Sequence, residues 1–215
     1  MTTERKYFDQ LWHVQVAVII AMILQVLLPQ RLTPGPRYVM PAIEAVLLVI
    51  LSLTTPKRYS GKSKARRIVA IAMIGITVLA NMTSLGLLVQ YLTSGAKADG
   101  KELIIAAVNI FLTNIIVFGL LYWEVDAGGP TMRHSNDTDR PDFMFPQENS
   151  KELAPPDWLP TFVDYLYVSA TNACAFSPTD TLPLTHRAKL LMLVQALVSL
   201  ITVALVTARA VNILN

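Results

Sequence analysis

The sequence predicts an all-α integral membrane protein with five transmembrane helices and a re-entrant half-helix and turn before the last span. Three observations carry this prediction. Of the 215 residues, 53% are hydrophobic and 15% are charged, whereas a soluble domain carries about 25% charged residues. Five long apolar runs follow one another along the chain, and a sixth is too short to cross a bilayer. This composition excludes a water-soluble enzyme of this size.

The five long runs are the predicted spans. A helix rises ~1.5 Å per residue and must cross a hydrocarbon core ~30 Å thick. The third and fifth runs are long enough for this, and the second is marginal. Aromatic residues at the run ends suit the headgroup region of a bilayer. The runs cover roughly residues 11–28, 38–53, 68–92, 103–123 and 188–211.

The basic residues predict the orientation of these spans. The loop over 56–67 holds six Lys and Arg residues and no acid, and short basic loops stay on the cytoplasmic side. We therefore expect a multi-pass protein of the cell membrane with its N-terminus in the cytoplasm. The net charge is +3, but in such a protein basic residues more often set the orientation of the spans than bind polyanions, so no nucleic-acid partner is expected.

The chain divides into three predicted regions. Residues 1–123 form a four-helix transmembrane region. Residues 124–160 form an acidic polar loop with eight acids against three bases. Residues 161–215 form the re-entrant helix, its turn and the final span.

The third region opens with the short apolar run, residues 161–175. Thr161 is the expected N-cap, with Asp164 at the third helical position. Pro178 prevents the helix from continuing. Non-helical backbone survives at membrane depth only when it is buried in protein or lines water. A half-helix, an irregular turn and a full span therefore predict a re-entrant pore loop.

This layout resembles the pore module of tetrameric potassium channels, in which a pore helix, a filter, an Asp-x-x-Pro turn and an inner helix follow in order. Asp180-Thr181-Leu182-Pro183 matches the turn, and Tyr165-Leu166-Tyr167-Val168-Ser169 matches the aromatic pore helix. The glycine filter of that family is absent at 175–179, so potassium selectivity does not carry over. Residues 118–212 also resemble a family of bacterial membrane proteins of unknown function.

The resemblance implies a homo-oligomer, with a tetramer favoured, whose re-entrant segments meet around an axis. A ring of Asp180 carboxylates would favour cations. The alternative for Asp180 is an Asx-type cap on the turn before Pro183. The pore or filter-like residues are then Thr171, Asn172, Phe176, Ser177, Pro178, Thr179 and Asp180.

The last span carries a polar stripe, and such a stripe is unfavourable toward lipid. Its residues share one helical face: Gln195, Ser199, Thr202 and Arg209. Two interpretations stay open, namely hydrogen bonds that join helices and a water-lined face of a pore. Glu44, one turn into the second run, is expected to snorkel or to pair with Arg37.

The functional hypothesis is a weakly selective cation channel whose partners are the lipid bilayer, inorganic ions and further copies of the chain. The alternative is a non-conducting membrane protein of channel-like fold with a structural or partner-binding role. No paired catalytic groups, metal-ligand spacing or phosphate-binding glycine motif occurs in the sequence. We therefore expect no enzyme activity, cofactor or metal.

Overall fold

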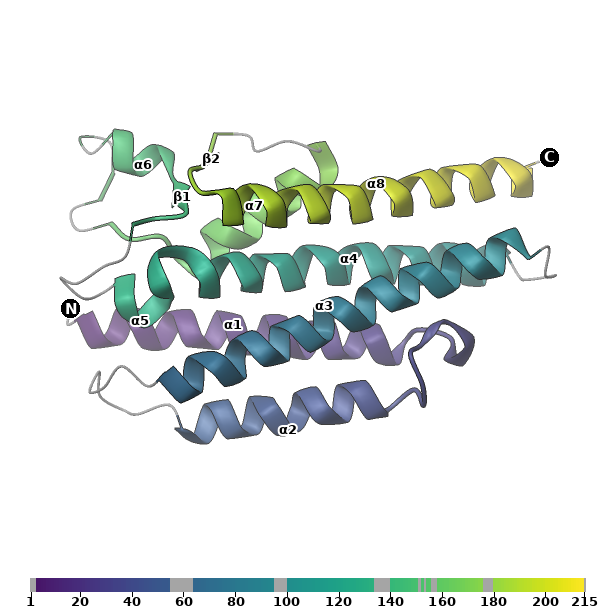
Figure 1. Ribbon diagram of the computed structural model, residues 1–215, viewed down its shortest axis with the longest axis horizontal. Helices are drawn as coiled ribbons and strands as arrows, with labels where there is room; N and C mark the ends of the chain where they lie inside the picture. Colours follow the sequence, from purple (N-terminus) through teal and green to yellow (C-terminus); the bar gives the residue numbers. More distant parts are fainter. Residues whose placement is uncertain are drawn as a thin grey trace.

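The computed structural model describes residues 3–54, 64–94, 100–133, 140–150, 152, 154, 155, 158–175 and 180–214. Its long helices run alternately in opposite directions (Figure 1). They are α1 (Thr3–Val26), α2 (Val39–Thr54), α3 (Lys64–Thr93), α4 (Gly100–Val125) and α8 (His186–Leu214). Each predicted apolar run therefore corresponds to one helix, although α1 begins eight residues earlier and ends two residues earlier than the predicted run, and the other boundaries differ by one to four residues.

Helix α4 is the centre of the molecule. It packs against α1 and α3 on one side and against α7 (Phe162–Ala175) and α8 on the other, while α2 packs against α1 and α3. The aromatic side chains Phe118 and Tyr122 of α4 are almost completely buried in the main hydrophobic core. Helix α4 therefore connects the N-terminal helices α1 and α3 to the C-terminal helices α7 and α8.

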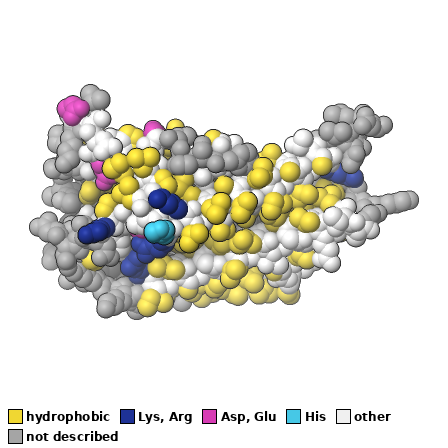
Figure 2. All heavy atoms as spheres, turned by 45° about the horizontal axis from the view of Figure 1, so that its top comes forward, with side chains coloured by type: hydrophobic (Ala, Val, Ile, Leu, Met, Phe, Trp, Pro, Cys, Tyr) yellow, Lys and Arg dark blue, Asp and Glu magenta, His cyan; other side chains and the backbone are white. Residues whose placement is uncertain are grey.

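Three helices in the described part of the chain are long and apolar enough to cross a membrane. They cover Arg67–Thr93, Gly100–Gly128 and His186–Arg209, and α1 and α2 contain shorter apolar stretches, Trp12–Val26 and Val39–Val49. Figure 2 shows hydrophobic side chains across the middle of one face, with charged side chains toward its ends. The structure is therefore compatible with an all-α membrane protein, as the composition predicts.

The chain reverses direction directly after α4. A short 3-10 turn, η2 (Asp126–Gly128), leads into α5 (Pro130–Arg133). Gly128 and Gly129 have φ values of 80° and 96°, a region that glycine enters without steric cost. A Cβ atom on Gly129 would lie 3.1 Å from the Glu124 carbonyl oxygen. The two glycines thus permit the tight turn that places Asp126 inside the protein.

Two short strands tie the polar loop to the segment after α7. Strand β1 (Phe143–Met144) pairs antiparallel with β2 (Leu182–Pro183), with Phe143 opposite Pro183. The helical turn α6 (Pro146–Asn149) follows β1, and η1 (Gln30–Leu32) lies between α1 and α2. The β1–β2 pair fixes where the chain enters α8.

Helix α7 is a short helix that lies against α4 and α8. It starts near the end of α4 and runs toward the middle of the bundle, while β2 and the start of α8 lie back where α7 began (Figure 1). The predicted N-terminal cap is confirmed, because Asp164 Oδ2 accepts hydrogen bonds from the Thr161 backbone N–H at 2.7 Å and from its hydroxyl at 2.8 Å. The 14 residues of α7 extend ~21 Å, less than a ~30 Å hydrocarbon core.

Candidate functional site

The predicted polar stripe of α8 lies inside the protein, where it meets polar groups from α4 and α7. We call this set the Gln195 cluster. Its side chains are each no more than 2% exposed, in a region where most neighbours are apolar. The cluster consists of Asn114 and Tyr122 from α4, Ser169 and Asn172 from α7, and Gln195 and Ser199 from α8.

Gln195 makes the central contacts of the cluster, because both the oxygen and the nitrogen of its side-chain amide are hydrogen-bonded. Its Oε1 accepts from the Tyr122 hydroxyl at 2.6 Å and from Asn172 Nδ2 at 2.8 Å. Its Nε2 donates to Ser169 Oγ at 2.6 Å and to the Ser169 carbonyl oxygen at 3.0 Å. One side chain therefore joins all three helices.

The remaining members of the cluster are also hydrogen-bonded. Ser169 Oγ donates to the Ile115 carbonyl oxygen at 2.6 Å, and Asn172 Nδ2 reaches the Met192 carbonyl oxygen at 3.0 Å. Asn114 Nδ2 donates to Ser199 Oγ at 2.9 Å. A buried polar group without a partner costs about 1–3 kcal/mol. The pairing of these groups makes the cluster compatible with an apolar interior.

The opposite face of α8 is apolar and exposed. It carries Leu190, Leu193, Leu197 and Leu200, each about half exposed. The other two predicted stripe residues differ. Thr202 is buried and donates to the Val198 carbonyl oxygen at 2.7 Å, whereas Arg209, near the end of α8, is partly exposed. The face of α8 that is open to the surroundings is thus suited to lipid.

The predicted pore residues on α7 and the following turn do not lie in one common site. Asn172 belongs to the Gln195 cluster, whereas the Thr171 hydroxyl donates to the carbonyl oxygens of Tyr167 and Val168 in its own helix, both at 3.0 Å. Asp180 lies exposed at the bend before β2. The remaining predicted filter residues, Phe176, Ser177, Pro178 and Thr179, lie outside the described residues.

A second polar group, at the end of the bundle where α4 stops, holds the polar loop against α7. Asp126 Oδ1 accepts from the backbone N–H groups of Asp142 at 2.6 Å and Phe143 at 3.2 Å. Its Oδ2 accepts from the Tyr165 hydroxyl at 2.5 Å. Arg133 donates to two backbone carbonyl oxygens, those of Trp123 and Asp126, both at 2.8 Å, and lies over the Tyr165 ring.

Tyr165 acts as a neutral donor in this group. Its side chain is fully buried, and a phenol is uncharged at neutral pH. The hydroxyl therefore donates a hydrogen bond to the Asp126 carboxylate.

Asp142 holds the first turn of α8. Its side chain is 1% exposed and accepts from the Thr185 hydroxyl at 2.5 Å and from the Arg187 guanidinium at 2.5 Å. Thr185 in turn caps α8, because its Oγ1 accepts from the Ala188 backbone N–H at 3.2 Å. Asp126 and Asp142 together anchor the starts of α7 and α8 to the polar loop.

The sequence analysis did not identify Asp126 and Asp142 as buried acids, nor did it identify the side chains that bond the polar stripe of α8. Asp126 and Asp142 lie among eight acids of one polar loop, and nothing in the composition marks them as buried. Asn114 lies within the fourth predicted span, but its partner Ser199 follows 85 positions later. Glu44 does not pair with Arg37: it accepts from Gln25 Nε2 at 3.0 Å and lies 2.8 Å from Thr77 Oγ1, and Arg37 Nε donates to the Val26 carbonyl oxygen at 2.5 Å.

Within the described ranges, no three His, Cys, Asp or Glu side chains come together as a metal ion would require. Comparison of the chain with known protein-family models, curated proteins and solved structures found no match. The functional argument therefore rests on the geometry of the Gln195 cluster and of the groups that anchor it.

Proposed function

We propose that this chain is a multi-pass membrane protein of five spans whose α7 is a re-entrant half-helix, and that its C-terminal module conducts no ions. In this proposal α4, α7 and α8 form a fixed scaffold of channel-like fold that holds the polar segment from Asp126 to Asn149 at one end of the bundle. The N-terminus lies in the cytoplasm.

The observation that carries this proposal is the position of Gln195. A pore-lining role requires the stripe to face water, but Gln195 is 0% exposed and its amide is bonded to Tyr122, Ser169 and Asn172 of the same chain. Turning the stripe toward an axis between subunits would break these bonds and leave their partners unsatisfied, which is unfavourable in an apolar interior.

The re-entrant placement of α7 is supported by its contacts. Asn172, close to the end of α7, bonds Gln195, and Gln195 lies nine positions after the start of α8 at His186. Nine residues of helix rise ~14 Å, about half of a hydrocarbon core. A helix that ends at that depth, followed by a return to β2 beside β1, matches a segment that turns back within the bilayer.

The anchoring contacts support the scaffold role. Asp126 binds the backbone of Asp142 and Phe143, and Asp142 binds Thr185 at the start of α8. The polar loop is thus attached to all three helices of the module. A segment held in this way presents a fixed polar surface at one end of the bundle.

A second candidate is the weakly cation-selective pore of a homo-oligomer. The position of α7 between α4 and α8, with exposed Asp180 at the following bend, favours it. In that arrangement Asp180 carboxylates from several subunits would supply the cation preference, and α8 would present its apolar face to the pore.

Ion flux separates the two candidates. The purified full-length protein is reconstituted in liposomes, and flux is measured under sodium, potassium and chloride gradients with and without an applied potential. We expect flux equal to that of empty vesicles. A cooperative thermal transition of the same preparation establishes that the protein is folded, and an added ionophore establishes that the vesicles are sealed.

Flux above that of empty vesicles would overturn the non-conducting scaffold and support the pore. The Asp180→Asn variant then tests the role of the carboxylate, because loss of the charge should lower the preference for cations over chloride. A monomeric mass in detergent would count against a shared central pore.

A further inference from the structure

A buried carboxyl group lies in the N-terminal half of the bundle, away from the Gln195 cluster. Glu44 of α2 is 1% exposed. The amide nitrogen of Gln25, from α1, donates to Glu44 Oε1 and Oε2, both at 3.0 Å, and Thr77 Oγ1, from α3, lies 2.8 Å from Oε1. Three helices therefore bring polar groups to one carboxyl.

The groups that face Glu44 carry no charge. Gln25 and Thr77 are neutral, and the residues of α4 at the same cavity are Val117 and Leu120. Arg37 lines the neighbouring pocket, where its Nε–H donates to the Val26 carbonyl oxygen. In the described part of the chain, no ion pair includes Glu44.

A carboxylate in such a place is unfavourable. An ionised group removed from water without a cation or sufficient donors has a large desolvation cost. Inside a membrane such a group is therefore either neutral through a change of protonation or paired with another charged or polar group. Uptake of one proton makes Glu44 neutral and removes the cost.

The hydrogen-bond geometry fits the protonated form. Thr77 Oγ1 lies 2.8 Å from Glu44 Oε1 and 3.0 Å from the Met73 carbonyl oxygen. The single hydroxyl proton of Thr77 cannot serve both acceptors. If Glu44 carries a proton on Oε1, Glu44 donates to Thr77 Oγ1 and Thr77 donates to the Met73 carbonyl oxygen, so both contacts are satisfied.

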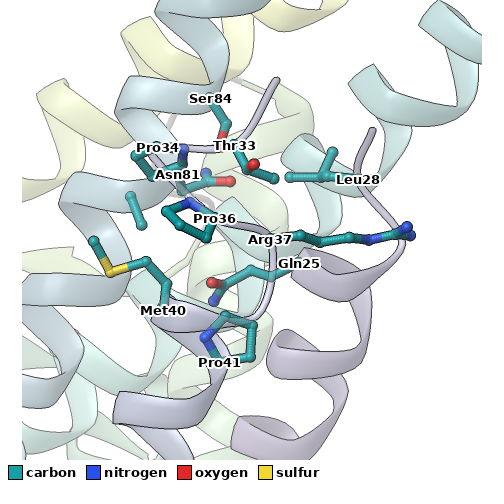
Figure 3. Close-up of a pocket in the computed structure, with 11 residues that line it drawn as sticks. Gln25, Leu28, Thr33, Pro34, Pro36, Arg37, Met40, Pro41, Asn81 and Ser84 are labelled. Atoms are coloured by element: carbon teal, nitrogen blue, oxygen red, sulfur yellow. The ribbon is translucent and has the colours of Figure 1, made fainter. Parts of the chain in front are cut away.

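The surroundings of Glu44 differ on its two sides. Gln25 also lines a pocket beneath the 29–38 segment, together with Thr33, Asn81 and Ser84 (Figure 3). On the other side Glu44 and Thr77 border a small cavity whose other walls are apolar, such as Val18 and Val117. Through Gln25, which donates to its carboxyl, Glu44 is thus connected to the pocket that holds the polar side chains of Thr33, Asn81 and Ser84.

We propose that Glu44 is a proton-binding site that exchanges with water through the pocket lined by Gln25, Asn81 and Ser84. The 29–38 segment, which contributes several residues of this pocket, lies at the end of the bundle opposite the N-terminus (Figure 1). The proposal rests on the proposed membrane location of α2 and not on the C-terminal module. Ion flux through that module would therefore neither support nor contradict a proton-binding site at Glu44.

Infrared spectroscopy of the full-length protein in liposomes tests the protonation state. We expect a carboxylic-acid carbonyl band at neutral pH that the Glu44→Gln variant lacks. The Glu44→Asp variant should shift the band rather than remove it, which identifies the group even if Glu44→Gln folds poorly. The Glu102→Gln variant is the matched control, since Glu102 is partly exposed and ion-paired with Arg31, and it should leave the band unchanged.

Two results would overturn a proton site. A band that is absent from the wild type at neutral pH, or that survives in a folded Glu44→Gln variant, shows that Glu44 is not the protonated group. Loss of the band on addition of sodium or potassium at constant pH shows that the site takes a metal cation in place of the proton.

Transfer into deuterated water tests the route. The band should shift as the proton is replaced, and the Ser84→Leu variant, which fills the polar pocket, should slow this shift at least about tenfold because it blocks the solvated path. Val117→Ile adds one methyl group to the apolar cavity and should leave the rate unchanged. An unchanged rate in Ser84→Leu, or a slower one in Val117→Ile, would overturn the proposed route.

Discussion

Asn172, near the end of α7, donates a hydrogen bond of 2.8 Å to Gln195 Oε1 in α8, and both side chains are buried. The sequence analysis placed Asn172 among the filter-like residues and Gln195 on the polar stripe of the last span, for which both hydrogen bonds between helices and a water-lined face were open. In the structure Asn172 and Gln195 are hydrogen-bonded to each other. Their polar groups therefore satisfy one another within the chain, which is the basis of the proposed scaffold.

Replacing Gln195 should destabilise the C-terminal module. The Gln195→Leu variant leaves the buried Tyr122 hydroxyl without its acceptor and the Asn172 amide with the Met192 carbonyl oxygen alone. Because each unsatisfied buried group costs about 1–3 kcal/mol, we expect a loss of about 2 kcal/mol or more in thermal unfolding in detergent. Leu197→Met, at an exposed position of α8, should stay within about 0.5 kcal/mol. Equal stability of the two variants would contradict the central role of Gln195.

Gly119 marks the closest approach of α4 and α7. A Cβ atom there would lie 3.1 Å from the Leu166 Cα atom, a backbone atom that cannot move aside alone. We expect Gly119→Ala to cost about 1–3 kcal/mol because the two helices must separate. Gly86→Ala is the matched control, since a Cβ atom on Gly86 of α3 meets nothing within 4 Å. It should be neutral or stabilising by up to about 1 kcal/mol, and a larger loss in Gly86→Ala than in Gly119→Ala would refute this packing.

Asp142 and Arg187 form one ion pair but should differ in their effect on stability. The Asp142 side chain is 1% exposed and also binds Thr185, whereas the Arg187 side chain is 52% exposed. Asp142→Ala removes the anchor of the first turn of α8 and should cost about 2–4 kcal/mol. Arg187→Met loses only a half-exposed charge and should cost about 1 kcal/mol or less. Chemical denaturation of both variants provides the comparison, and a larger effect of Arg187→Met would show that the pair itself carries the stability.

Cysteine labelling tests the proposed five-span topology. The chain has one cysteine, Cys174, so Cys174→Ser gives a background without thiols. Gln30, Ser94 and Asn149 are exposed. Gln30 begins η1 after α1 and Ser94 follows α3, and these two helices end at the same end of the bundle, whereas α6, which ends at Asn149, lies at the other (Figure 1). On intact cells, a membrane-impermeant maleimide should label Gln30→Cys and Ser94→Cys but not Asn149→Cys. Labelling of all three, or of Asn149→Cys alone, would contradict the topology or its orientation.

The sequence alone was sufficient to locate the helices and the short helix α7. Apolar runs mark helices because the composition changes sharply at their ends: the fourth run, 103–123, lies within α4, and Thr161 and Asp164 fixed the start of α7. Helical periodicity also identified the face of α8 that holds Gln195 and Ser199. It could not identify their partners, because Asn114 and Ser169 lie on other helices and periodicity relates residues of one helix only.

The buried acids could not be predicted for a different reason. Asp126 and Asp142 stand in a loop of like charges, and their burial depends on the turn at Gly128 and Gly129 and on the β1–β2 pair. Glu44 was noted as an ionisable residue near an expected span, but its partners Gln25 and Thr77 come from two neighbouring helices. In each case the decisive contacts join distant parts of the chain.

The Gln195 cluster also restricts how α8 can move. Rotation of a helix by one residue turns its faces by about 100°, which would carry Gln195 and Ser199 away from α4 and α7 and break their hydrogen bonds. Twisting and bending of α8 relative to its neighbours are therefore opposed by the same set of bonds. Any conformational change at this end of the protein should carry α4, α7 and the first half of α8 together as a rigid body.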